Sequence, residues 1–117
     1  MYVALFYGQV NPNHDALEYE ALGLRMYELA SKMPGFVDFK QANLPDSCEL
    51  AIAYFETEED MQAWYDHPEH RKAQIAGRES ILDDYLIEVC EIKRSYTKSS
   101  SYFQDDTAKK NNTTFDI

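Results

Sequence analysis

The residues best suited to chemistry lie in one short segment, Trp64-Tyr-Asp-His67-Pro-Glu-His70. A neutral imidazole near the start of a helix can accept a proton from a phenol, so His70 is a candidate general base. Trp64 offers a large flat ring on which an aromatic ligand can stack. Each residue also has a structural interpretation: Trp64 as core, His67 as a helix cap, and His70 as packing at the helix start.

A metal site at the two histidines is not expected. Two imidazoles bind a metal ion only when both nitrogens converge, and a third ligand usually completes the site. Pro68 interrupts the helix between His67 and His70, and no Cys/His cluster lies nearby in the sequence. The acidic run Glu58–Asp60 is typical of the positive end of a helix. The sequence also lacks a glycine-rich phosphate loop, a CxxC pair and a Ser-His-Asp arrangement.

Hydropathy and turn residues predict the elements that position this segment. A capped helix is expected from Asp15 to Met33, ended by Pro34-Gly35. Thr57 is expected to cap a second helix, and Pro68 to start a third that runs towards Leu82. The strands are expected at 2–10, 36–43, 48–56 and 84–96.

The order β-α-β-β-α-α-β is that of an α+β, ferredoxin-like split βαβ fold with an antiparallel sheet. The first strand should lie between the third and the fourth. Cys48 and Cys90 would then be two strands apart, too far to bridge, so we expect two free thiols. Both faces of the central strands are apolar, but helices can cover only one. We therefore expect a homodimer that packs through the uncovered sheet faces.

Composition narrows the class of protein. The 117 residues suffice for one domain, expected at 1–96, followed by a polar C-terminal tail at 97–117. The net charge of −10 opposes binding to nucleic acid or to an anionic membrane. No apolar run is long enough to span a bilayer, and the N-terminus lacks the basic region of a signal peptide. A cytoplasmic location is the expectation.

Several segments resemble the antibiotic biosynthesis monooxygenase superfamily. They are the helix from Asp15 with Met33-Pro-Gly-Phe36, the stretch Tyr54–Glu59, and Ala63–Gln74 with its Trp-x2-His-x2-His pattern. The resemblance covers about residues 1–96. It implies a dimeric α/β barrel of two ferredoxin-like units, each with a pocket between its helices and the concave sheet. The superfamily includes cofactor-independent oxygenases of aromatic polyketides and quinols, haem-degrading enzymes, and proteins with no assigned activity.

The resemblance also suggests roles for particular positions. A helix Trp is implicated in catalysis in members that oxidise aromatic polyketides, and Trp64 stands at this position. Many members carry His-x5-His where this chain has Trp64-x5-His70. The aromatic oxygenases have an Asn where this chain has Asp60, and the haem degraders have an axial His where this chain has Gln74.

The sequence therefore predicts a cofactor-independent monooxygenase acting on a small planar quinol, phenol or anthrone. Its catalytic residues would be His70 and Trp64, and Tyr54, His67 and Arg78 would contact the substrate. Arg78 has an alternative role in a surface ion pair with a nearby carboxylate. Two other functions stay open. One is a non-catalytic barrel that binds a ligand or a partner. A cavity filled by the protein's own side chains would favour this function. The other is haem binding.

Overall fold

The strand β1 (Tyr2–Val10) is one of two inner strands of a four-stranded sheet. The computed structural model of the protein describes residues 1–13 and 16–99. The strand β1 pairs antiparallel with β3 (Cys48–Phe55) on one side and with β4 (Leu82–Glu91) on the other. The strand β2 (Phe36–Leu44) completes the order β2-β3-β1-β4. The predicted ferredoxin-like topology is confirmed. A strand with neighbours on both sides is shielded from water, which suits the apolar run from Tyr2 to Val10.

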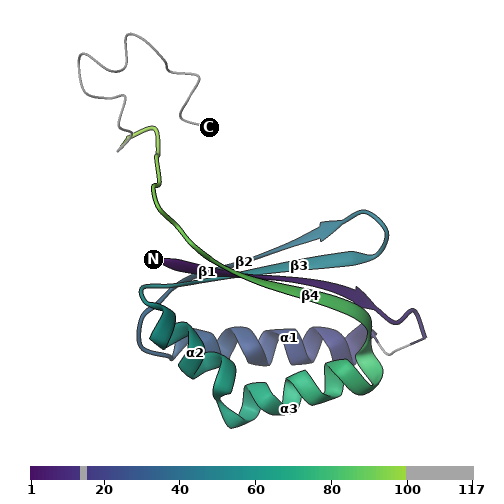
Figure 1. Ribbon diagram of the computed structural model, residues 1–117. Coiled ribbons are helices and arrows are strands. Elements are labelled where there is room, and N and C mark those ends of the chain that lie inside the picture. The colour runs from purple at the N-terminus through teal and green to yellow at the C-terminus, as the bar shows by residue number, and fades with distance from the viewer. Residues whose placement is uncertain (14–15, 100–117) are drawn as a thin grey trace.

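All the helices lie on one side of this sheet (Figure 1). They are α1 (Ala16–Ser31), α2 (Glu58–Asp66) and α3 (Pro68–Ala76). A short π-helical turn, η1 (Gly77–Ile81), continues α3 into β4. The predicted Asp15 cap of the first helix lies outside the described residues. Among those residues, no helix is long and apolar enough to cross a membrane.

Local signals set the break between α2 and α3. Thr57 caps α2, because its hydroxyl oxygen accepts a hydrogen bond from the Asp60 backbone at 3.1 Å. Pro68 then occupies the first turn of α3, where a missing backbone N–H costs nothing. His67 lies between the two helices and caps the second. The break at His67 turns the chain three residues after Trp64 and places His70 in the first turn of α3.

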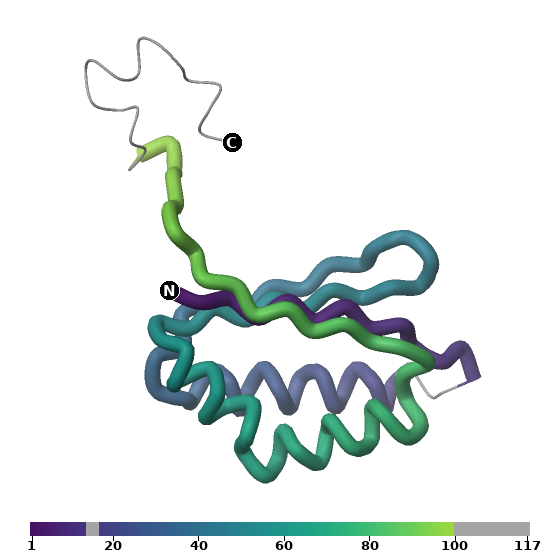
Figure 2. Tube along the Cα trace, viewed as in Figure 1, coloured from purple at the N-terminus to yellow at the C-terminus, as the bar shows by residue number. Residues whose placement is uncertain are grey.

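The last strand differs from its predicted range of 84–96. It starts two residues earlier and ends at Glu91, because Glu91 is opposite Tyr2, where β1 begins. One further backbone hydrogen bond, from Ile92 to Met1 at 2.9 Å, ends the pairing. The chain after Glu91 leaves the sheet on the side away from the helices (Figure 2). Of the predicted tail, only 97–99 lie within the described residues.

The core lies between the helices and the sheet. Phe55 is fully buried and contacts Met61 and Trp64 of α2 in a cluster with Ala30 and Ala53. Burying a side chain of this size contributes roughly 2–3 kcal/mol. The core is concentrated at the end of the sheet where β3 runs into α2.

The opposite face of the sheet is also apolar, and the helices do not cover it. Residues facing each other across adjacent strands share a face, which places Leu5, Ile52 and Tyr54 together there. The edge strand β4 adds Leu86, which is 53% exposed. Cys48 and Cys90 are free thiols, as predicted.

Candidate functional site

A cavity of about 710 Å³ lies between the helices and the sheet. Small side chains form its floor, since Ala4, Ala51 and Ala53 occupy neighbouring positions on β1 and β3. Larger residues at these positions would fill the space against the helices. The cavity is open and is not filled by the protein's own side chains. The feature that would favour a non-catalytic protein is therefore not observed.

Trp64 forms part of the cavity wall and also part of the core. Its ring stacks on Phe55 with centroids 5.6 Å apart, and the residue is 7% exposed. The indole Nε1–H is buried and has no hydrogen-bond partner within the described part of the chain. A buried donor without an acceptor costs free energy. Trp64 therefore belongs to the core and also forms part of the cavity wall, and its role towards a substrate stays a prediction.

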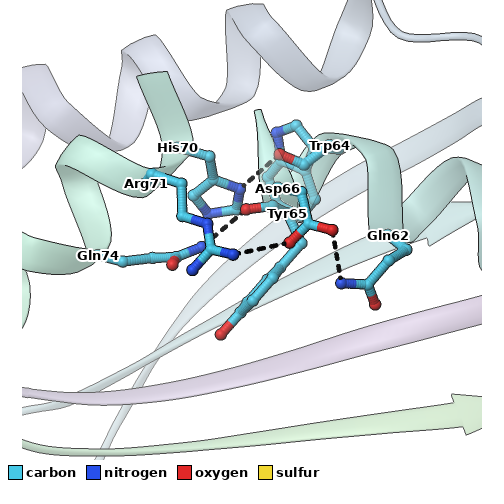
Figure 3. A network of polar contacts seen from close by, with 7 residues as sticks. All are labelled: Gln62, Trp64, Tyr65, Asp66, His70, Arg71 and Gln74. Atoms are coloured by element: carbon cyan, nitrogen blue, oxygen red, sulfur yellow. Dashed lines mark hydrogen bonds and ion pairs between the residues drawn. The ribbon is translucent and has the colours of Figure 1, made fainter. Parts of the chain in front are cut away.

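His70 lies directly against Trp64 and also lines the cavity. The two ring centroids are 4.3 Å apart, and Nδ1 of His70 lies 3.1 Å from the Trp64 carbonyl oxygen (Figure 3). A carbonyl can only accept, so Nδ1 carries the proton and Nε2 keeps its lone pair. Burial lowers the pKa of His70, partly offset by the bond to the Trp64 carbonyl. The imidazole is thus held neutral, with its basic nitrogen free.

Two of the predicted substrate contacts lie outside the cavity. His67 caps α3, with its Nδ1 accepting a hydrogen bond from the Glu69 backbone at 3.1 Å, and it is absent from the cavity wall. Tyr54 belongs to the sheet face that points away from the helices, where Lys40 Nζ lies 5.0 Å from the centre of its ring. The side chains of His67 and Tyr54 therefore do not reach the cavity that Trp64 and His70 line.

Arg78 does line the cavity, at the end where η1 leads into β4. Its guanidinium donates a hydrogen bond to the Tyr85 hydroxyl at 3.2 Å. This bond raises the pKa of Arg78, so the side chain stays cationic. The guanidinium is exposed and can present charge to a ligand in the cavity.

Sequence reasoning missed several residues of the cavity wall. Tyr19 of α1 and Glu49 of β3 meet in a hydrogen bond, and burial together with Glu49 raises the pKa of the Tyr19 hydroxyl. Tyr65 packs edge-on against His70, with ring centroids 5.6 Å apart. Gln74 donates to the Tyr65 carbonyl at 2.9 Å (Figure 3). The inward alternation of β3 and the helical spacing from His70 to Gln74 were the available signals.

Asp60, which stands where the aromatic oxygenases carry an Asn, does not line the cavity. Its carboxylate packs against Gly35 in the turn after α1. Within residues 1–13 and 16–99, no three His, Cys, Asp or Glu side chains gather in a group that could hold a metal ion.

Comparisons with known proteins place this geometry in context. No family model matches the chain. The uncharacterized protein YqjZ of Bacillus subtilis (strain 168) is 26% identical over 106 residues, covering 91% of this chain and 88% of that protein.

Solved structures share the fold at lower sequence identity. SnoaB, a cofactor-independent oxygenase from Streptomyces nogalater, aligns with a TM-score of 0.67 and 16% identity over 80% of this chain and 94% of its own. A Deinococcus radiodurans protein, provisionally described as an antibiotic biosynthesis monooxygenase, gives 0.73 and 13% over 83% and 97%. A dimeric ferredoxin-like protein of unknown function from Thermobifida fusca gives 0.60 and 17% over 79% and 92%. These likenesses show that the chain has the same ferredoxin-like fold as these proteins.

Proposed function

We propose that this protein is a cofactor-independent monooxygenase acting on a small planar aromatic of the quinol, phenol or anthrone type. The observation that carries the proposal is the neutral His70 imidazole, held against Trp64 in the wall of an open cavity. The fold shared with SnoaB, which is a cofactor-independent oxygenase, supports the same reaction class.

The chemistry requires little from the protein beyond a base and a dry, flat binding site. Nε2 of His70 removes a proton from the substrate and leaves an electron-rich anion. The anion reduces O₂ by one electron, and the two radicals combine to form a C–O bond. The resulting peroxide anion takes back the proton from the His70 imidazolium and becomes a hydroperoxide. For an anthrone, loss of water from this hydroperoxide converts the reacting CH₂ to C=O. One oxygen atom enters the product and the other leaves as water.

Trp64 and Arg78 are assigned supporting roles. The Trp64 ring contributes one wall of the binding site, against which a flat substrate can pack. The Arg78 guanidinium can stabilise negative charge on a substrate oxygen at its end of the cavity. His67 and Tyr54 lie outside the cavity wall and receive no role in substrate contact.

We also propose that two copies associate through the sheet faces that the helices leave uncovered. The apolar residues there, with Leu86 at the edge strand, would otherwise remain in water. The Thermobifida fusca protein of the same fold is a dimeric ferredoxin-like protein, which supports this assembly. A reducing cytoplasmic location stays a prediction, supported by the two free thiols.

Oxygen consumption tests the proposed reaction. Purified protein is added to dithranol, a tricyclic anthrone, and to a panel of quinols, with heat-inactivated protein as the control. We expect uptake of one O₂ per molecule of dithranol oxidised. The H70Q variant keeps a donor towards the Trp64 carbonyl but lacks the base, so it should be slower by a factor of about 10²–10⁴. A rate equal to that of the heat-inactivated control would reject the proposal.

A further inference from the structure

The cavity has two chemically different ends. His70 lies near the start of α3 and Arg78 eight residues further on, a helical distance of about 12 Å. Along β3, Glu49 is six residues from Phe55, on which Trp64 stacks, and this separation is roughly 20 Å. A polar group near Glu49 is therefore far from the proposed base, and a flat ligand must be elongated to reach both.

A row of residues crosses the sheet at the end remote from His70. Asn43 is opposite Glu49, Glu49 is opposite Gly8, and Gly8 is opposite Tyr85 on the other side. Asn43, Glu49 and Tyr85 all line the cavity. From above, the hydroxyl of Tyr19 on α1 donates a hydrogen bond to the Glu49 carboxylate. This contact holds the carboxylate towards the helices.

Glu49 has accepting capacity beyond this single bond. An ionised carboxylate has two oxygens and about four lone-pair positions, and it cannot donate. Glu49 is partly buried, so water does not fully solvate it. Glu20 also lines this end and adds a second negative charge. The surroundings therefore favour a ligand group that donates, and they oppose an anion.

Through its partner Tyr85, Arg78 lies at the same end of the cavity as Glu49, but two strands away across β1. A side chain at Gly8 would come within 2.8 Å of Phe6 Cε1, so the Phe6 ring lies beside this position. Phe6 also stacks on Tyr85, with centroids 6.1 Å apart and planes inclined by 19°. The cation at Arg78 and the anion at Glu49 thus belong to different parts of the cavity wall.

A second hollow, of about 310 Å³, adjoins the cavity at this end. The two hollows share Tyr19, Glu20, Asn43 and Glu49. A substituent that reaches Glu49 therefore has room beyond the aromatic part of its ligand.

We infer that Glu49, positioned by Tyr19, selects elongated planar substrates carrying a hydroxyl or amino donor at the end remote from the reacting group. This inference rests on the proposed function, since it assumes that an aromatic ligand occupies the cavity with its acidic proton near His70. It adds the class of substituent that the site recognises and the residue that recognises it.

Three elongated probes with the same planar stilbene frame test this selection by calorimetric titration. They are trans-4,4′-dihydroxystilbene, trans-4-hydroxy-4′-methoxystilbene and trans-4′-hydroxystilbene-4-carboxylic acid, whose remote groups are a donor, an acceptor and an anion. We expect the diol to bind about tenfold more tightly than the methoxy compound, as a hydrogen bond to a charged group allows. The carboxylate should bind most weakly.

The E49Q variant should reduce the preference for the diol over the methoxy compound to about threefold or less, and should strengthen binding of the carboxylate. E56Q removes one negative charge at an exposed position outside the cavity, and it should keep the wild-type order. Thermal melting checks that each variant is folded. If E49Q does not fold, Y19F, which releases the Glu49 carboxylate, should change the same ratio in the same direction.

Equal binding of all three probes, tightest binding of the carboxylate, or an unchanged ratio in folded E49Q would each overturn this inference. None of these results would affect the test of oxygen consumption. Absence of binding by every probe would instead contradict the aromatic site itself, and with it both proposals.

Discussion

At the scale of single residues, the contact between His70 and the Trp64 carbonyl decides what the site can do. The carbonyl oxygen also accepts the backbone N–H of His67 at 3.2 Å, so the C-terminal end of α2 holds both groups. The protonated Nδ1 points to the backbone, which leaves Nε2 for a substrate. The same contact therefore orients the imidazole and sets its tautomer.

The lowered pKa of His70 predicts the pH dependence of turnover. The base acts in its neutral form, and acidification protonates it. Because burial moves this protonation below the ordinary value of 6.5, kcat/KM should be level above pH 6.5 and fall only on the acid side of it. Oxygen uptake measured from pH 5 to 8 checks this. A fall that is centred above pH 6.5 would show that another group controls the rate.

Replacement of Trp64 by Phe separates its two roles. The smaller ring should cost about 1 kcal/mol, because part of the packing on Phe55 is lost while an unpaired buried donor is removed. For a domain of this size, the Tm should fall by about 4–8 °C. Turnover of dithranol by the folded W64F protein should fall by at least about tenfold. Unchanged turnover would restrict Trp64 to a packing role.

At the scale of the elements, turn and cap residues made the boundaries of the helices predictable from the sequence. Thr57, Pro68 and Pro34-Gly35 mark helix boundaries that the structure confirms, because their effects act within a few residues. The position of Tyr54 could not be predicted from such local signals. Alternation along β3 places Tyr54 and Phe55 on opposite faces, but it does not say which face the helices will cover. That depends on packing between distant segments.

The pair Tyr19 and Glu49 was missed for the same reason. They come from α1 and β3, thirty positions apart in the sequence, and only the folded chain places them together. The range of β4 was also wrong, because the apolar pattern to Tyr96 does not reveal where the partner strand begins. Contacts that are local in sequence were predictable, and contacts between elements were not.

Two glycines give a matched test of the local backbone structure, one in the turn after α1 and one within α1. Gly35 has a φ of +78°, and a side chain there would overlap the Asp60 carboxylate. The G35A variant should therefore lose about 1–3 kcal/mol of unfolding free energy. Gly23 lies within α1, and the nearest atom to an added Cβ is 3.8 Å away. G23A should gain about 0.5–1 kcal/mol from helix propensity. Denaturant unfolding measures both values, and a stable G35A protein would contradict the turn geometry.

At the scale of the whole molecule, the uncovered sheet face predicts assembly. Sedimentation at micromolar concentration should show a species of twice the 13.6 kDa chain mass. A charge in the middle of this face, as in I52K, should give monomers because the lysine would be buried without a partner. I75K, which changes a residue that is 56% exposed on α3, is the matched control and should stay dimeric. A monomeric wild-type protein would contradict the predicted assembly.

A crystal structure of the protein soaked with dithranol in the absence of oxygen tests the central claim most directly, because the ligand cannot turn over. We expect ring density in the cavity, packed against Trp64, with a substrate oxygen or the reacting carbon within reach of His70 Nε2. Density only outside the cavity, or a cavity closed by the protein's own side chains, would contradict it.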